Sequence, residues 1–340
     1  MIGSFFVPCS SFFILHFGIR TFHRTTGTIM RKLMSFGIVF IFSSVAGAQD
    51  MPLTQVILPG EGWQAAAVEC KSAGGLAGDG RGSVYIADQD GKQIWRLDKD
   101  GKASVFAKTE GGVHGLAAAD GRLFAAEPDA KKVVVYDADG KHAAEYKDIA
   151  ASYLAVTKGG EIYCSVPNEK AVYLLDRDGK KRKVADNLQW PGALMLWTDG
   201  GTLVVADAGD KYLYAFRVQK NGDLDAREPY YPFRVRRDRI HLLLGVVDAR
   251  TNPSIPFWPS ENEGLTLDAA GRAYATSREG LQVFDPTGRL SGVMVAPERA
   301  ALGGVAFGGA DLDRLYVACG GKVYVRKVQS KGVKAQAAAP

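Results

Sequence analysis

Six copies of one short phrase follow each other along this chain, and this repetition limits its possible folds more than any other feature. The clearest copy reads "GLTLDAAGRAYATSREGLQVFDPTGRL" from Gly264 to Leu290. The copies begin, in register, at Gly74, His114, Ser152, Gly192, Glu263 and Gly303. Successive starts lie 40, 38, 40, 71 and 40 residues apart. A period near 40 residues indicates a repeat architecture in which each unit buries its faces against its neighbours.

Each copy contains three runs of apolar, β-branched or aromatic residues, separated by turns that contain Gly and Asp. This spacing is typical of hairpins, and runs such as "VYIAD" lack the period of a helix. A fourth strand fits in the more variable stretch before the next copy. We therefore predict an all-β fold, a six-bladed β-propeller with about four antiparallel strands per blade. We expect Leu53–Leu58 to pair with the final blade and close the ring, which removes exposed sheet edges.

The long spacing between the fourth and fifth copies indicates an insertion at about 230–262, rich in Arg and Pro. It is interpreted as a lid or rim loop beside the fifth blade, as a surface excursion packed on the propeller, or as a frameshift in part of the sequence. Residues 49–330 are otherwise expected to form a single propeller domain, and residues 331–340 a disordered tail.

The chain begins with a segment that is typical of an export signal. Met30 is the expected start, followed by the basic pair Arg31 and Lys32 and the apolar run Leu33–Val45. Small residues at Ala46–Ala48 favour cleavage before Gln49, so residues 1–48 are interpreted as a leader. The protein is then secreted or periplasmic, with no stable membrane span after cleavage. An uncleaved N-terminal anchor is the alternative, although the apolar run is shorter than the ~20 residues that a span needs.

Charge and cysteine content exclude several classes of function. The net charge is +5, but residues 1–48 contain four basic residues and no acid, so the remainder is almost neutral. Binding to nucleic acid is not expected, because it needs a basic face. The three cysteines beyond the leader form no CxxC pair and indicate neither a disulfide framework nor a zinc site. The "DADGK" and "DRDGK" segments lack EF-hand spacing and are interpreted as hairpin turns between outer strands.

The fifth and sixth copies carry a family resemblance. "EGLTLDAAGRAYATSREGLQVFDPTGRL" followed by "AFGGADLDRLYVAC" resembles the SMP-30/gluconolactonase/LRE family of six-bladed propellers. The resemblance extends from about Gly74 to Lys327 and is strongest in these two copies. It implies a lactonase-type hydrolase that holds one divalent cation, most often calcium, in a central pocket. Carboxylate and amide oxygens are suitable ligands for such a hard cation.

The family's ligand positions are only partly kept in this sequence. Gly74 stands where the resemblance implies a Glu ligand, and Ser152 stands where it implies an Asn ligand, followed by Tyr153 in place of an Asp. Asp207, at the end of a strand in the fourth copy, matches the third ligand. His114 occupies the position of a substrate-binding Asn. The resemblance therefore implies a degenerate metal site.

The candidate site residues follow from these positions. Asp207 is the expected catalytic residue and a metal ligand, and Glu263 could add a second carboxylate to the metal site or contact substrate. His114, Ser152 and Glu127 are expected to bind substrate at the same pocket. An alternative for Asp207 is that it caps a turn, because Asp88 occurs in a similar strand-end "AD" context.

Two functions from different classes compete. The first is a secreted, gluconolactonase-like hydrolase that acts on a lactone or sugar-derived ester through a divalent cation, Ca²⁺ before any other, in the central channel. The second is a non-catalytic propeller that binds a sugar, a sugar acid or a partner protein and has lost the metal ligands. A periplasmic interaction domain that uses the Arg-rich insertion is a third, weaker option. Two carboxylates meeting in the channel would favour the first, whereas a solvent-exposed Glu263 would favour the second.

Overall fold

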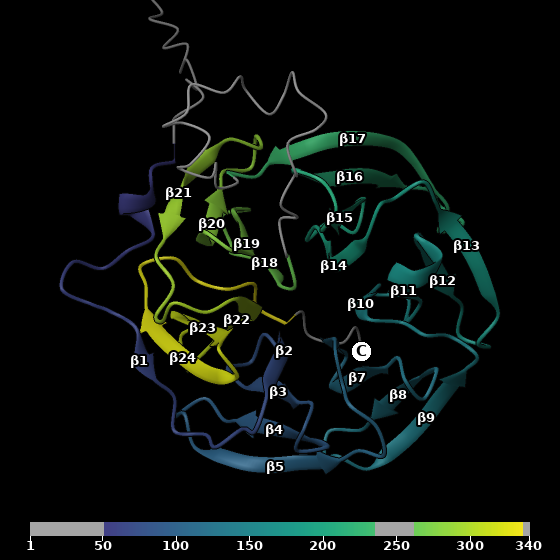
Figure 1. The fold of residues 1–340 in the computed structure, drawn as a ribbon, viewed down its shortest axis with the longest axis horizontal. Helices are drawn as coiled ribbons and strands as arrows, with labels where there is room; N and C mark the ends of the chain where they lie inside the picture. The colour runs from purple at the N-terminus through teal and green to yellow at the C-terminus, as the bar shows by residue number, and fades with distance from the viewer. Residues whose placement is uncertain (1–50, 235–261, 336–340) are drawn as a thin grey trace, which may run out of the picture. The chain divides into compact units, whose positions relative to one another are not determined.

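The computed structural model describes residues 51–234 and 262–335. The expected leader, its cleavage site and residues 235–261 of the expected insertion lie outside these ranges. Within them, six four-stranded antiparallel sheets are arranged as blades around a central axis (Figure 1). The prediction of a six-bladed propeller with four strands per blade is confirmed.

In the first five blades the strand nearest the axis comes first in the sequence and the outermost strand comes last. The sixth blade also runs outward from β22 to β24, but its outermost strand, β1, comes from the N-terminal part of the chain. The first three blades contain β2 (Ala73–Gly78), β3 (Val84–Asp88), β4 (Gln93–Leu97), β5 (Ala103–Lys108), β6 (Leu116–Ala119), β7 (Arg122–Glu127), β8 (Lys132–Tyr136), β9 (His142–Lys147), β10 (Tyr153–Val156), β11 (Ile162–Val166), β12 (Ala171–Leu175) and β13 (Lys181–Ala185). The last three contain β14 (Pro191–Leu196), β15 (Thr202–Asp207), β16 (Tyr212–Val218), β17 (Leu224–Pro232), β18 (Leu265–Leu267), β19 (Ala273–Ser277), β20 (Gly280–Phe284), β21 (Leu290–Met294), β22 (Leu302–Gly308), β23 (Arg314–Cys319), β24 (Lys322–Lys327) and β1 (Gln64–Ala65).

The ring is closed by the N-terminal segment, but with different residues from those expected. β1 pairs with β24, with Gln64 opposite Val325 (Figure 1). Of the expected Leu53–Leu58 strand, Leu53–Gln55 form a 3₁₀ turn and Ile57 makes a single bridge to Val328. The start of the expected insertion also differs, because β17 continues to Pro232.

The outer hairpins owe their shape to a repeated Asp-x-x-Gly-x turn. Oδ1 of Asp98 accepts hydrogen bonds from the backbone N–H groups of Asp100 and Lys102, both at 2.9 Å. Gly101 then adopts a φ of 89°, which favours glycine. Asp137 and Asp176 make the same pair of bonds. The interpretation of these segments as hairpin turns is confirmed.

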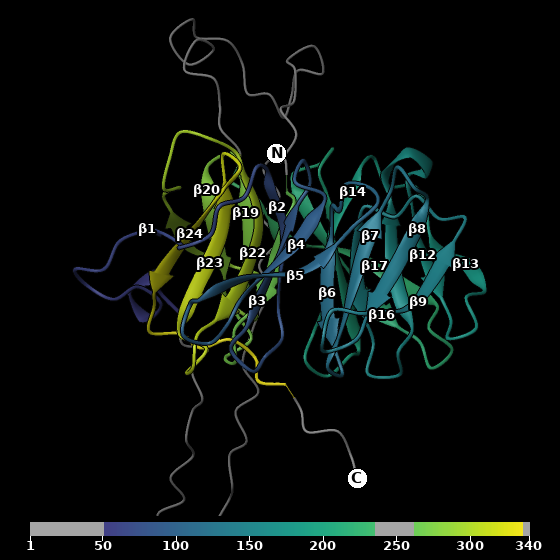
Figure 2. The same ribbon diagram turned by 90° about the horizontal axis from the view of Figure 1, so that it is seen from below.

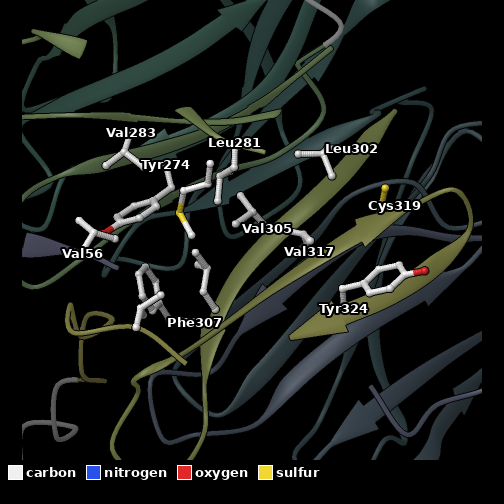
Figure 3. Close-up of a cluster of buried hydrophobic side chains, with 13 residues drawn as sticks. Val56, Tyr274, Leu281, Val283, Leu302, Val305, Phe307, Val317, Cys319 and Tyr324 are labelled. Atoms are coloured by element: carbon white, nitrogen blue, oxygen red, sulfur yellow. The ribbon is translucent and has the colours of Figure 1, made fainter. Parts of the chain in front are cut away.

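The core lies between neighbouring blades. The second strand of each blade is an almost continuous run of buried residues because both faces of the blade are covered; β3 and β11 are buried throughout. Figure 3 shows the cluster between the fifth and sixth blades, in which the rings of Tyr274 and Phe307 meet edge to face with centroids 5.1 Å apart. Cys164 and Cys319 are buried in strands, as expected for small apolar residues.

The strands run between two faces of the propeller (Figure 2). At one face the inner strands begin, and we call the ring of six residues that opens the repeats the mouth: Gly74, His114, Ser152, Gly192, Glu263 and Gly303. The opposite face carries the Asp-x-x-Gly-x turns. No helix in the described ranges is long and apolar enough to cross a membrane.

The segment Gln329–Ala335, which we call the strap, crosses the face opposite the mouth. The backbone N–H of Ala269 donates to the Lys331 carbonyl at 2.7 Å, and that of Ala335 donates to the Gly80 carbonyl at 3.0 Å. The expectation of a disordered tail from residue 331 is therefore wrong for Lys331–Ala335, because these hydrogen bonds attach the strap to the first and fifth blades. Residues 336–340 lie outside the described ranges.

Candidate functional site

The mouth brings residues from all six blades into one ring, since inner strands of neighbouring blades touch there. Gly75 donates its N–H to the His114 carbonyl at 3.1 Å, which joins the first and second blades. A Cβ atom on Gly115 would lie 2.5 Å from the Ser152 carbonyl oxygen, and one on Gly303 would lie 3.2 Å from that of Gly74. His114, Ser152 and Glu263, three of the predicted site residues, thus belong to one ring.

Asp207 is fully buried at the end of β15 and holds the loop that leads into β14. Its carboxylate accepts backbone N–H groups from Gln189 at 2.8 Å, Trp190 at 2.7 Å and Gly209 at 3.3 Å. Asp88 does the same in the first blade for Lys71 and Ser72, each at 3.0 Å. The geometry matches the alternative in which the strand-end acid caps a turn.

Glu127 ends β7 in the equivalent place in the second blade and is also buried. Burial raises the pKa of its carboxyl group, while the Lys132 ammonium and the backbone N–H of Gly111 oppose that shift. Lys132 Nζ lies 3.8 Å from Glu127 Oε2 and 2.7 Å from Glu110 Oε2. These contacts tie Glu127 to the loop that precedes the second blade.

His114 is half-buried at the start of the second blade. Its Nε2 atom lies 2.7 Å from the side-chain nitrogen of Gln89 in the first blade. When the Gln89 amide N–H donates to Nε2, the ring is neutral with its proton on Nδ1; the donor and acceptor roles of this pair follow the imidazole tautomer. Burial lowers the pKa of His114, and the charge of Asp129 partly opposes this. His114 therefore offers an N–H donor at neutral pH.

The charge of Glu263, at the start of the fifth blade, acts on Tyr153, at the start of the third blade. The Glu263 side chain is exposed, while its backbone N–H donates to Thr276 Oγ1 at 3.2 Å. Burial raises the pKa of the Tyr153 phenol, and the negative charge of Glu263 raises it further. The carboxylate of the fifth blade is thus close enough to act on the phenol of the third. Ser152, next to Tyr153, is buried, and its backbone N–H donates to the Ser165 carbonyl at 2.9 Å.

The residues in the described ranges do not fit the calcium ion that the family resemblance implies. These ranges contain no group of three or more His, Cys, Asp and Glu side chains placed to hold a metal. Three backbone N–H groups already donate to the Asp207 carboxylate, on both of its oxygens, and take up most of the lone pairs that a cation there would use. Gly74 and Ser152 supply neither a carboxylate nor an amide at the other two positions.

A pocket of about 250 Å³ lies at the other end of the inner strands. It is lined largely by apolar side chains, including Leu196, Leu265 and Phe307, and by Val333 of the strap. None of the predicted site residues lines it. Thr198 and Thr266 add hydroxyl groups to its lining, but no ionisable side chain of the described ranges lines it.

Sequence reasoning did not count two neighbours of the mouth, Gln89 and Tyr153, among the candidate residues. Gln89 directly follows the strand-end Asp88, and only the fold brings it to His114. Tyr153 is detectable from the register of the repeats, because the other five copies carry Gly or Ala at its position. For Tyr153, the signal in the sequence was a large residue at a position where the other copies carry a small one.

Comparisons with known proteins agree with this architecture. Residues 152–320 match the family model described as the SMP-30/Gluconolactonase/LRE-like region. No curated protein sequence matches the chain.

Among solved structures, a gluconolactonase from Xanthomonas campestris is 20% identical, with a TM-score of 0.62. The match covers 81% of this chain and 92% of the gluconolactonase chain. A luciferin-regenerating enzyme is 14% identical with a TM-score of 0.61 and covers 82% and 100%. Regucalcin from Agrobacterium tumefaciens, described as a calcium-binding protein, is 14% identical with a TM-score of 0.59 and covers 82% and 98%. At such identities these structures support the fold. The chain therefore carries an SMP-30/gluconolactonase/LRE-like region, from the start of the third blade into the sixth, within a six-bladed propeller.

Proposed function

We propose that this protein is a lactonase-like propeller that binds a small lactone or sugar-derived ester at the mouth and hydrolyses it. The observation that carries the proposal is the chemistry of the ring. Gly74 and Gly303, in the adjacent first and sixth blades, leave one part of the mouth without side chains, and Gly192 leaves a second part in the fourth blade, while His114 and Glu263 supply polar groups to the rest. A few convergent polar groups around an open space are typical of a small-molecule site.

Ring opening needs a donor for the carbonyl oxygen and a base for water. In the proposal, His114 donates its Nδ1–H to the lactone carbonyl, and the Glu263 carboxylate takes a proton from the attacking water. The water oxygen bonds to the carbonyl carbon, the ring C–O bond breaks, and the leaving alkoxide receives the proton. The product is a hydroxy acid. No step requires a cation, in keeping with the contacts of Asp207.

The second candidate is a non-catalytic propeller that binds a sugar acid. It is favoured by the exposed side chain of Glu263, the outcome expected of a binding propeller, and by the three backbone N–H groups on Asp207, which take up the one acid kept at the family's ligand positions. Titration with gluconate distinguishes the candidates when combined with a hydrolysis assay. Binding without hydrolysis supports this second function.

The location of the protein is a separate proposal that rests on the sequence alone. We propose that the chain is exported after cleavage before Gln49, because a basic pair, an apolar run and small residues follow each other there. N-terminal sequencing of the mature protein should begin at Gln49. A mature protein that begins at Met1 or Met30 would contradict export by this signal.

The test of function is hydrolysis of glucono-1,5-lactone, followed by acid release above the spontaneous rate. His114→Gln and Glu263→Gln are each expected to lower kcat/KM by about 100-fold or more, the usual contribution of a positioned acid or base. The matched controls are His142→Gln, on the outer strand β9, and Glu61→Gln, on an exposed loop. Wild-type rates in both mouth variants would contradict the assignment.

A further inference from the structure

A side-chain contact joins the first and second blades at the mouth. Gln89 directly follows β3 of the first blade, and His114 opens the second blade. The side-chain amide nitrogen of Gln89 lies 2.7 Å from Nε2 of the His114 ring. Both residues are half-buried, so the pair is partly shielded from water, which strengthens a hydrogen bond between them.

Gln89 is held in place by its own backbone and by a glycine of the neighbouring loop. Its N–H donates to the Ser72 carbonyl at 3.0 Å, and its carbonyl accepts from the Lys92 N–H at 3.4 Å. A Cβ atom on Gly112 would lie 3.0 Å from Gln89 Cγ and 3.7 Å from its amide nitrogen. The side chain of Gln89 therefore passes over the bare backbone of Gly112, in the loop that leads to His114.

The other ring nitrogen of His114, Nδ1, is left for a ligand. The backbone of His114 is fixed, because its N–H donates to the Ala126 carbonyl at 3.0 Å and its carbonyl accepts from the Gly75 N–H at 3.1 Å. Within the described ranges Nδ1 makes no hydrogen bond, nor is it one of the buried polar atoms that lack a partner there. Nδ1 is therefore the nitrogen that water or a ligand can reach.

The atoms in contact decide where the imidazole proton lies. In one arrangement the amide N–H donates to Nε2, and a neutral ring carries its proton on Nδ1. In the other, the amide is turned over, its carbonyl accepts from Nε2–H, and Nδ1 becomes an acceptor. The structure places the amide nitrogen of Gln89, which can only donate, beside Nε2 and so selects the first arrangement. Burial also favours the neutral ring by lowering the pKa of His114, although the charge of Asp129 opposes this.

We propose that Gln89 is a positioning residue that holds His114 in the Nδ1–H form, so that the mouth selects ligands that bring an acceptor oxygen to this donor. A lactone carbonyl or a sugar-acid carboxylate meets this condition, whereas an ammonium group does not. The proposal rests on the function proposed above for the identity of the ligand, but the tautomer is measured without any ligand. A donor that is fixed before binding needs no reorganisation when the carbonyl oxygen arrives.

The first experiment reads the protonation of both ring nitrogens by nitrogen NMR of the labelled full chain at about pH 8, where free imidazole is neutral. The chain contains five histidines, and the spectrum of His114→Gln identifies the signals of His114. We expect a protonated Nδ1 and a bare Nε2 in wild type. Gln89→Glu should reverse this, because a carboxylate only accepts and therefore favours Nε2–H. Gln89→Leu should give a mixture of the two forms.

Two further variants sharpen the comparison. Gly112→Ala adds a Cβ atom where Gln89 passes, at a residue outside the positive-φ region, so it should displace the amide and resemble Gln89→Leu. Gln64→Leu, on the exposed strand β1, is the matched control and should leave the His114 signals unchanged. A wild-type ring with its proton on Nε2 would overturn the proposal, as would a Gln89→Leu variant that keeps only the Nδ1–H form. Circular dichroism identifies the folded variants, and Gln89→Glu keeps the test open if Gln89→Leu does not fold.

The second experiment measures hydrolysis of glucono-1,5-lactone in a double-mutant cycle. Gln89→Glu should lower kcat/KM about as far as His114→Gln, by about 100-fold, because Nδ1 then lacks its proton. Gln89→Leu should lower it by about 10-fold, since the ring is also free to turn. Both losses should appear in kcat more than in KM, because the donor acts on charge that develops in the transition state. In a His114→Gln background neither substitution should add a further loss, since Gln89 acts through His114. Losses that multiply would overturn the positioning role.

The two experiments separate two kinds of failure. If no form of the protein hydrolyses the lactone while the ring nitrogens respond as expected, the proposed function fails and the fixed tautomer of His114 stands. If Gln89→Glu reverses the tautomer and still hydrolyses the lactone at the wild-type rate, the positioning role of Gln89 is overturned and the proposed function stands through another donor.

Discussion

The two faces of the propeller follow opposite rules. At the face opposite the mouth, the hairpin turns repeat one design, in which an Asp side chain accepts two backbone N–H groups and a glycine adopts positive φ. At the mouth, the first residue of the repeat changes from blade to blade, from glycine to His114, Ser152 and Glu263. Repetition therefore builds the scaffold, and departures from it carry the chemistry.

The largest expected effect is a loss of stability at the face opposite the mouth. Asp268 is fully buried and binds Arg272 Nη1 at 3.1 Å and the Tyr274 hydroxyl at 3.0 Å, while Arg272 also reaches Gln55 and Tyr274 reaches Ser330 of the strap. Asp268→Ala leaves a buried guanidinium without its carboxylate, so unfolding free energy should fall by about 3–5 kcal/mol. Guanidinium-induced unfolding measures this loss.

The matched control is Asp98→Ala, which removes the same kind of turn bond at an exposed hairpin. Its loss should be clearly smaller, because no buried charge is left unpaired. Equal losses in the two variants would show that the turn bonds, and not the buried cluster, supply the stability.

A second prediction separates strand-end acids from mouth residues. Asp207→Asn replaces one of two carboxylate oxygens with a donor that faces a backbone N–H, so unfolding free energy should fall by about 1–3 kcal/mol. Asp88→Asn, which loses equivalent contacts, should behave alike. Thermal unfolding with and without calcium measures both. A calcium-dependent stabilisation that Asp207→Asn removes and Asp88→Asn keeps would restore Asp207 as a metal ligand.

The third effect is a pH dependence that begins at the mouth. Burial lowers the pKa of folded His114 below its ordinary value of 6.5. As pH falls below that value, the unfolded chain binds the proton first, so this contribution to stability is present at higher pH and decreases toward acid. In His114→Gln, the decline of unfolding free energy below pH 6.5 should be shallower than in wild type or His142→Gln. Urea unfolding at several pH values tests this, and an unchanged slope would contradict the burial of the imidazole.

The smallest effect concerns Glu127. Burial raises the pKa of the folded carboxyl group above its ordinary value of 4.5. The folded state then holds its proton more tightly, so stability is lost as pH rises through the folded-state pKa. Glu127→Gln, which cannot ionise, should melt slightly higher than wild type at neutral pH and no higher at pH values below 4.5. A lower melting temperature at neutral pH would mean that the ion pair with Lys132 outweighs the cost of burial.

The fold was predictable from the sequence to a large extent. Strand periodicity and turn residues recur at each copy, so six blades could be counted without knowledge of long-range contacts. Ring closure was assigned to Leu53–Leu58, whereas Gln64–Ala65 make it, because a two-residue strand gives no periodic signal. The strap was missed because its order depends on hydrogen bonds to Gly80 and Ala269, which are distant in the sequence.

The site was predictable only as a set of positions. The repeats place His114, Ser152 and Glu263 in one ring, but they do not reveal how each side chain is used. Asp207 and Asp88 share a strand-end context, and only the structure shows that backbone N–H groups occupy both carboxylates. The Gln89–His114 contact joins two blades and has no local signature.

The central claim is that the chemistry of this propeller belongs to the mouth and not to a cation at Asp207. Initial rates of glucono-1,5-lactone hydrolysis by wild type, Glu263→Gln and Asp207→Asn, each with calcium and with a chelator, test it most directly. The account predicts a loss of about 100-fold in Glu263→Gln under both conditions. It also predicts no effect of the chelator on wild type or on folded Asp207→Asn. Activity that needs calcium, disappears in Asp207→Asn and survives in Glu263→Gln would contradict the account.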